Sequence, residues 1–169
     1  MKKLSQILLF SLGILCLTLA SQSAQAACTD PARPEAEWQR CYFDERGFKD
    51  VDLTGANLRD TRFIRAKLTG SNLSKVSAHR ARFISAQVNN VKFDGARLTE
   101  VDFTKTDLSN SSFRKANLRR ARLIRANLRG ADLTGARLKG ADLLNADLSG
   151  ATWTDGKTIC AEGSLGQCN

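Results

Sequence analysis

The sequence predicts an all-β solenoid, a chain wound into stacked coils, and three observations carry this prediction. Taken in steps of five from Phe48 to Trp153, every residue is apolar. Two positions before each of them stands Ala, Val, Thr or Ser, except at Arg46. Related sequences also recur at every fourth unit, a longer period of 20, which fits four five-residue units to one turn of a coil. A period of five matches neither the 3.6 residues of a helical turn nor the two-residue alternation of a flat strand.

Residues 1–26 are typical of a secretory signal peptide. Lys2 and Lys3 form a basic start, an apolar run covers residues 7–20, and the tripeptide A-Q-A at 24–26 places small residues at −3 and −1 of a cleavage site. The run is short for a membrane-spanning helix, and no second apolar run follows it. We therefore expect an exported protein, in the periplasm or secreted, or in the thylakoid lumen if the source is a cyanobacterium.

Four cysteines remain after the predicted cleavage site: Cys28, Cys41, Cys160 and Cys168. An even number of cysteines behind an export signal favours disulfides in an oxidising compartment. The alternative, a zinc site, is not supported, because the spacings fit no common zinc pattern.

The cleanest five-residue units are A-D-L-T-G at 131–135 and A-D-L-S-G at 146–150. This pattern resembles the pentapeptide-repeat family, A-(D/N)-L-x-x, and it covers residues 46–155. The resemblance implies a right-handed quadrilateral β-helix, with four units per turn and about 5.5 coils for the 22 units. It also implies that the central residue and the small residue two before it point inward, and that the other three positions face solvent.

Open ends of a solenoid need covering, since each coil contacts only its neighbours. We expect residues 27–45 to form an N-terminal cap with a short helix over residues 34–40, where Trp38, Tyr42 and Phe43 cover the first coil. At the other end, Trp153 and a loop over residues 156–169 are expected to close the stack.

The same solenoid predicts the disulfide pairing. Its two ends lie far apart along the stack, whereas the Cα atoms of a bridged pair lie within about 7 Å. The predicted pairs are therefore Cys28 with Cys41 and Cys160 with Cys168, one at each end.

The period of 20 is clearest in the units R-F-I-R-A at 62–66, R-F-I-S-A at 82–86 and R-L-I-R-A at 122–126. The residue after the centre forms an outward column in this phase: Ile64, Ile84, Thr104, Ile124 and Leu144. Arginines flank the column: Arg62, Arg65, Arg82, Arg122 and Arg125. An exposed apolar stripe with a basic border suits an interface. The rival explanation is structural, since stacked β-branched residues support strand pairing.

The same phasing sorts the charges onto four sides, which we name the Phe48, Leu53, Leu58 and Phe63 sides after their first central residues. Within residues 46–155, the outward positions of the Leu58 and Phe63 sides together carry 13 basic and 4 acidic residues, whereas the other two sides carry 7 of each. A basic surface can bind anions, or it can serve solubility alone.

The sequence offers no catalytic, cofactor-binding or metal-binding constellation. It has one histidine, His79, at an outward position, and it lacks a phosphate-binding loop or a Cys-His pair. The aspartates that precede central leucines are expected to accept hydrogen bonds from nearby backbone.

We therefore predict a non-catalytic exported interaction or scaffold protein that binds a protein partner or an anionic envelope surface through the Ile column, with self-association as a further possibility. An alternative is a DNA-mimicking topoisomerase-binding protein, as some members of the family are; the basic charge and the export signal disfavour it. A nucleic-acid binder is permitted by positive charge, but the export signal and the lack of interleaved exposed aromatics argue against it.

Overall fold

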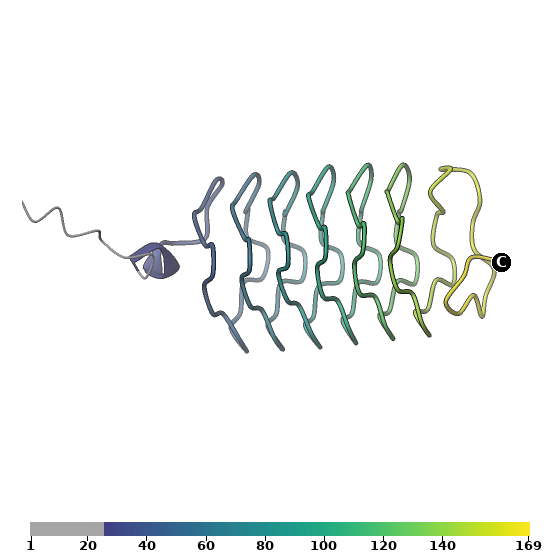
Figure 1. Ribbon diagram of the computed structural model, residues 1–169, viewed down its shortest axis with the longest axis horizontal. Helices are drawn as coiled ribbons and strands as arrows, with labels where there is room; N and C mark the ends of the chain where they lie inside the picture. The colour runs from purple at the N-terminus through teal and green to yellow at the C-terminus, as the bar shows by residue number, and fades with distance from the viewer. Residues whose placement is uncertain (1–25) are drawn as a thin grey trace, which may run out of the picture.

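The computed structural model describes residues 26–169, and the predicted signal peptide over residues 1–26 lies outside them apart from its last residue. A short 3-10 helix, η1 (Ala26–Thr29), is the one helix of the described residues, and no continuous strand occurs in them. After η1 the chain forms a column of stacked coils, with the two ends of the described chain at opposite ends of the column (Figure 1). None of the described helices is long and apolar enough to cross a bilayer.

Successive coils are joined by parallel bridges at a constant offset of four units, from Glu37 with Asn57 to Asp132 with Thr152. Each side of a coil contributes one bridge residue, which is why the pairing forms ladders of isolated bridges. The backbone N–H of a central residue donates to the coil that follows, and the N–H before it donates to the coil that precedes. Phe63 N donates to the Arg82 carbonyl at 2.7 Å, and Arg82 N donates to the Thr61 carbonyl at 2.9 Å. The coil is therefore four-sided, with one five-residue unit on each side.

The corners explain why one unit makes one side. After each central residue the chain turns, and the N–H three positions later donates back, as Ala66 N does to the Phe63 carbonyl at 3.1 Å. The second turn residue has a positive φ, such as 56° at Arg65. Within residues 26–169, seventeen non-glycine residues share this left-handed conformation, which costs roughly 1–2 kcal/mol per residue with a Cβ. The stack stabilises many locally unfavourable corners.

The interior is filled by the central residues and the small residues two positions before them, as the sequence predicts. On one side, Phe63, Phe83 and Phe103 stack with ring centroids 4.9 and 5.1 Å apart. Leucines take over toward the C-terminus, and Leu118 and Leu123 are fully buried. Where the small residue is Ser or Thr, its buried hydroxyl donates to a carbonyl of the preceding coil, so it leaves no unpaired polar group in the core.

The expected helix over residues 34–40 does not form. These residues already follow the five-residue pattern: Trp38 and Phe43 are buried at central positions, and Ala36 and Cys41 are buried at the small positions. The reason is that backbone pairing with the next coil and burial of two aromatic rings outweigh the local helical preference of E-A-E-W-Q-R. The coil pattern therefore begins by Ala36, ahead of the expected start at residue 46.

Arg46, the exception in the small column, is exposed, and its guanidinium lies over the rings of Phe43 and Phe48, 5.4 and 5.8 Å from their centroids. The arginine therefore covers two aromatic residues from outside, where an inward side chain of its size would not fit.

The C-terminal tail folds back over part of the last coil. Residues 156–169 include antiparallel bridges of Leu165 with Asp147 and of Ile159 with Thr152, on the Phe48 and Leu53 sides. The last central residues of the other two sides, Leu138 and Leu143, are only partly buried. The tail thus closes two sides of the column, while Trp153 beneath it is half-buried.

The disulfides pair Cys28 with Cys41 and Cys160 with Cys168, with Cα atoms 5.4 and 4.8 Å apart. These are the expected pairs, and each holds one end of the column.

Candidate functional site

The outward column of the Phe63 side consists of Ile64, Ile84, Thr104, Ile124 and Leu144. Each of these residues follows a central residue and occupies the first position of a corner. Their backbones are hydrogen-bonded from coil to coil: the Ile84 carbonyl accepts from Arg65 N at 3.0 Å, and the Ile124 carbonyl accepts from Lys105 N at 2.9 Å. The structure therefore brings together, on one side, residues from five successive coils that lie far apart in the sequence.

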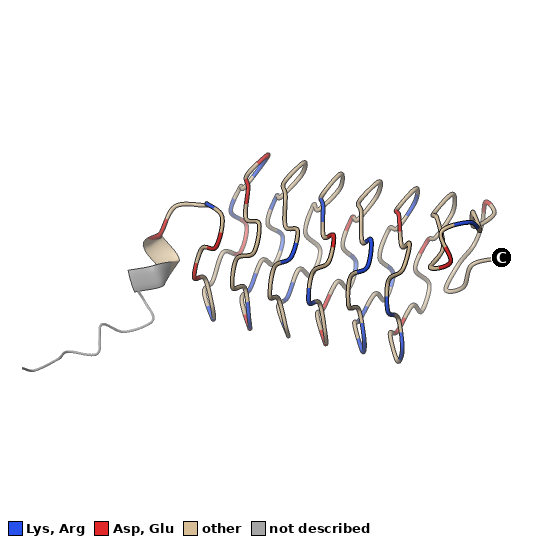
Figure 2. Ribbon diagram, turned by 90° about the horizontal axis from the view of Figure 1, so that it is seen from above, with Lys and Arg blue, Asp and Glu red and all other residues tan. Residues whose placement is uncertain are grey.

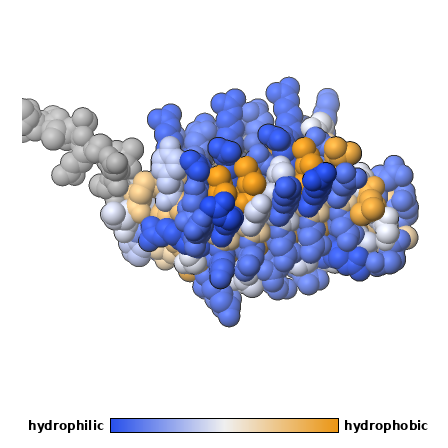
Figure 3. Space-filling model, turned by 90° about the horizontal axis from the view of Figure 1, so that it is seen from below, coloured by the Kyte–Doolittle hydropathy of each residue, from blue (hydrophilic) through white to orange (hydrophobic). Residues whose placement is uncertain are grey.

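The apolar side chains of this column are not equally accessible. Ile64, Ile84 and Ile124 are half-buried between neighbouring side chains, whereas Leu144 at the last coil is 59% exposed. Figure 3 shows apolar side chains in a row along the stack, bordered by hydrophilic ones. The column thus contributes to packing between coils and also presents apolar surface.

Three of the five flanking arginines are in ion pairs. Arg62 Nη2 donates to Asp44 Oδ2 at 2.7 Å, and Arg62 also lies over the Tyr42 ring, 5.2 Å from its centroid. Arg65 pairs with Glu45. Arg122 lies 3.5 Å from Asp102.

The other two flanking arginines, Arg82 and Arg125, are exposed, and no carboxylate within residues 26–169 forms an ion pair with either. They flank the middle and C-terminal part of the column.

The acidic partners Asp44 and Glu45 are site residues that the sequence analysis did not assign to this side. With the first coil included, the outward positions of the Phe63 side carry six basic and four acidic residues, and those of the Leu58 side carry eight and three. The excess positive charge is therefore concentrated on the Leu58 side, while acidic and basic residues both occur along the stack (Figure 2). The sequence does contain a sign that the first coil starts earlier. Steps of five back from Phe48 reach Phe43 and Trp38, with Cys41 and Ala36 at the small positions.

The aspartates before central residues have the role expected of them. Asp102 Oδ1 accepts from Thr104 N at 3.0 Å, and Asp52 Oδ1 accepts from Thr54 N at 2.9 Å. The hydroxyl of Thr54 also donates to Asp52, and these bonds lower the pKa of the Asp52 carboxyl. Such carboxylates brace corners of the coil.

His79 lies on the Leu58 side and is half-buried. Its Nδ1 is 3.1 Å from the Thr99 carbonyl and 2.9 Å from the Thr99 hydroxyl. The described residues hold no cluster of three or more His, Cys, Asp or Glu side chains able to bind a metal.

Two family models match the chain. The model described as "Pentapeptide repeat region" covers residues 56–123, and the one described as "Pentapeptide repeats (8 copies)" covers residues 116–152. No curated protein matches the chain.

The chain is also similar to several solved structures. HetL, a pentapeptide repeat protein involved in heterocyst differentiation regulation from the cyanobacterium Nostoc, is 31% identical over 64% of this chain and 64% of its own, with a TM-score of 0.48. QnrB1, a plasmid-mediated fluoroquinolone resistance protein, is 23% identical over 70% of this chain and 63% of its own, with a TM-score of 0.47. A pentapeptide repeat protein from the Arabidopsis thaliana thylakoid lumen is 23% identical over 72% and 83%, with a TM-score of 0.33. The chain spans less than two thirds of HetL and of QnrB1.

The constant register between coils and the two buried columns define a quadrilateral β-helix. The chain belongs to the pentapeptide-repeat family, whose fold is the right-handed form of this helix.

Proposed function

We propose that this protein is a non-catalytic, exported interaction protein whose Phe63 side binds a protein partner. The observation that carries the proposal is the apolar Ile column, beside which Arg82 and Arg125 form no ion pair with a carboxylate of residues 26–169. Desolvating apolar side chains gives affinity, and unpaired arginines at the rim favour a partner with carboxylates around an apolar centre.

The part of the Ile column from Ile84 to Leu144 supports this proposal best. Leu144 is well exposed, and Arg125 N donates to the Leu144 carbonyl at 2.9 Å, so the arginine and the leucine lie at adjacent corners. At the N-terminal end, by contrast, Asp44 and Glu45 already form ion pairs with Arg62 and Arg65. We therefore centre the proposed contact on Ile84, Ile124 and Leu144.

The test places a photo-crosslinking residue at Ile84 or Ile124 in the producing cell, and at Asn89 or Ser109 as matched controls. The control positions occupy the same corner position on the Phe48 side. We expect one protein to be crosslinked from the column and not from the controls. Crosslinks to lipid, or to a second copy of the chain, would replace the protein-partner proposal with an envelope surface or with self-association.

The second step uses the variant Ile84→Thr/Ile124→Thr, which keeps β-branching and removes apolar surface. We expect the crosslinked product from a probe at Leu144 to fall at least about tenfold, since two buried methyl-bearing side chains contribute roughly 1 kcal/mol or more each. An unchanged melting temperature together with an unchanged crosslink would mean that the column only supports the pairing of coils.

Export is a separate part of the proposal, supported by the sequence of residues 1–26 and by two disulfides. N-terminal sequencing of the protein from its native cell is expected to start at Ala27. A chain that retains residues 1–26 and is found in the cytoplasm with free thiols would contradict it.

A further inference from the structure

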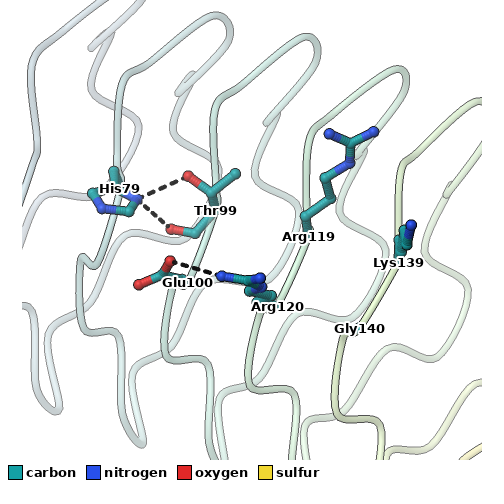
Figure 4. A pocket seen from close by; sticks show the side chains of 7 residues that line it. All are labelled: His79, Thr99, Glu100, Arg119, Arg120, Lys139 and Gly140. Atoms are coloured by element: carbon teal, nitrogen blue, oxygen red, sulfur yellow. Dashed lines mark hydrogen bonds and ion pairs between the residues drawn. The ribbon is translucent and has the colours of Figure 1, made fainter.

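A groove of about 550 Å³ lies on the Leu58 side, away from the Ile column. Its lining residues are His79, Thr99, Glu100, Arg119, Arg120, Lys139 and Gly140. They come from four successive coils at the two positions that follow the central residue, as Figure 4 shows. The groove exists because short side chains alternate with long ones: Thr99 and Gly140 leave space beside Arg119 and Arg120.

Three cations line this groove, and two of them form no ion pair within residues 26–169. Arg119 and Lys139 occupy the same corner position in adjacent coils, and neither forms an ion pair with a carboxylate of residues 26–169. Like charges placed opposite one another in neighbouring strands are unfavourable. Elsewhere in the solenoid an acidic residue of the neighbouring coil often pairs with the cation, as Asp132 does with Arg114 at 3.1 Å.

The third cation, Arg120, is only weakly held. Its Nη1 lies 3.9 Å from Glu100 Oε1, whereas Arg80 Nε donates to Glu100 Oε2 at 2.9 Å. Glu100 is thus primarily the partner of Arg80, and the hydrogen bond from Arg80 lowers the pKa of its carboxyl. Arg120, with 78% of its side chain exposed, is free to turn toward a ligand in the groove.

We propose that this groove binds a phosphate group. Arginine presents its N–H donors in a planar fork that matches phosphate oxygens, and lysine adds a compact point charge. Two arginines and one lysine around an open space suit a doubly charged tetrahedral anion better than a single carboxylate. The phosphate could be carried by a soluble ester or by a lipid headgroup, and the experiment distinguishes these two sources.

The experiment measures binding of inorganic phosphate by calorimetry, and binding to vesicles of phosphatidylcholine with and without phosphatidic acid. The variants are Arg119→Gln/Lys139→Gln and, as a matched control, Arg59→Gln. Arg59 occupies the same corner position on the same side but does not line the groove. All three side chains are exposed, so the variants are expected to keep the melting temperature of the parent protein.

We expect Arg119→Gln/Lys139→Gln to weaken binding at least about tenfold, since each charge-assisted hydrogen bond to phosphate accounts for roughly that factor. Arg59→Gln should change it less than about twofold. Glu100→Gln should strengthen binding several-fold, because it removes a negative charge and releases Arg120. Binding of inorganic phosphate identifies a soluble ester as the source, and binding to phosphatidic acid vesicles alone identifies a headgroup. Equal losses in the groove and control variants, or no binding of either probe, would overturn the proposal.

Discussion

The four sides of the column divide into two pairs that share one interior but differ outside. The Phe48 and Leu53 sides have balanced charge over residues 46–155, and the C-terminal tail pairs with both. The Leu58 and Phe63 sides carry the groove and the Ile column, and they end in the partly buried Leu138 and Leu143. Both pairs are wound by the same five-residue rule. Outward residues can therefore differ from side to side while the core stays constant. The Leu58 and Phe63 sides, which carry the excess of basic residues, also carry the groove and the Ile column.

The largest expected effect tests the shared interior. Leu118→Asp on the Leu58 side should unfold the protein or split the stack, at a cost above about 4 kcal/mol, because it buries an unpaired charge in a dry core. Asn117→Asp, one residue earlier, should be mild, since that side chain faces outward. Thermal denaturation of the two variants checks this. Comparable losses of melting temperature would show that inner and outer positions are wrongly assigned.

A smaller loss of stability is expected where acidic residues of the first coil pair with arginines of the Phe63 side. Asp44→Ala removes the bond from Arg62 and a second bond at 3.0 Å from Ile64 N. We expect a loss of about 1–2 kcal/mol in unfolding free energy in urea, because both bonds go to a charged, partly shielded acceptor. Glu45→Ala, which removes an exposed ion pair with Arg65, is the control and should lose clearly less. If Glu45→Ala is the more damaging change, the first coil is not held as described.

A substitution at a corner of the coil is expected to increase stability instead of lowering it. Lys105 has φ of 57°, so Lys105→Gly should relieve left-handed strain and stabilise the protein by about 0.5–1 kcal/mol after the entropic cost of glycine. Gly135→Ala on the Leu53 side should destabilise it by a similar amount. A Cβ at Gly135 would have ordinary contacts with Lys115, the closest at 3.4 Å, so the change isolates the cost of its φ of 69°. Urea unfolding measures both, and the same sign for both would contradict the role of the corners.

The smallest effect concerns the tail that closes the Phe48 and Leu53 sides. Asp155 accepts bonds from Lys157 N and Thr158 N, both 2.9 Å, and from the Thr158 hydroxyl, and these bonds lower its pKa from 3.8 to about 2. Because the pKa is depressed in the folded state, the stabilisation is present above pH 3.8 and is lost as pH falls toward 2. Asp155→Asn should therefore flatten the fall of melting temperature between these values. A parallel acid profile in the variant would show that Asp155 does not hold the tail.

The candidate site shows which contacts the sequence repeat could predict and which it could not. The period of 20 correctly predicted that Ile64, Ile84 and Ile124 share one side, because the register is set once every side holds one unit and every turn has four sides. It did not reveal that Arg62 and Arg65 are paired, since their partners lie in a segment that was assigned to a helical cap. The groove was also missed, because it depends on how long side chains of adjacent coils leave space between them.

The sequence by itself determined the five-residue unit, the inward and outward positions, the four-sided coil and the cysteine pairs. The reason is that a constant repeat places each residue beside the residue 20 positions further along the chain. Only the tertiary structure decided where the coil begins, which sides the tail covers and which charges are neutralised. The physical reason is that these features depend on contacts between one coil and the next, such as Arg62 with Asp44, or on the tail folding back. Local propensity at residues 34–40 favoured a helix, and pairing with the next coil, which buries Trp38 and Phe43, prevailed.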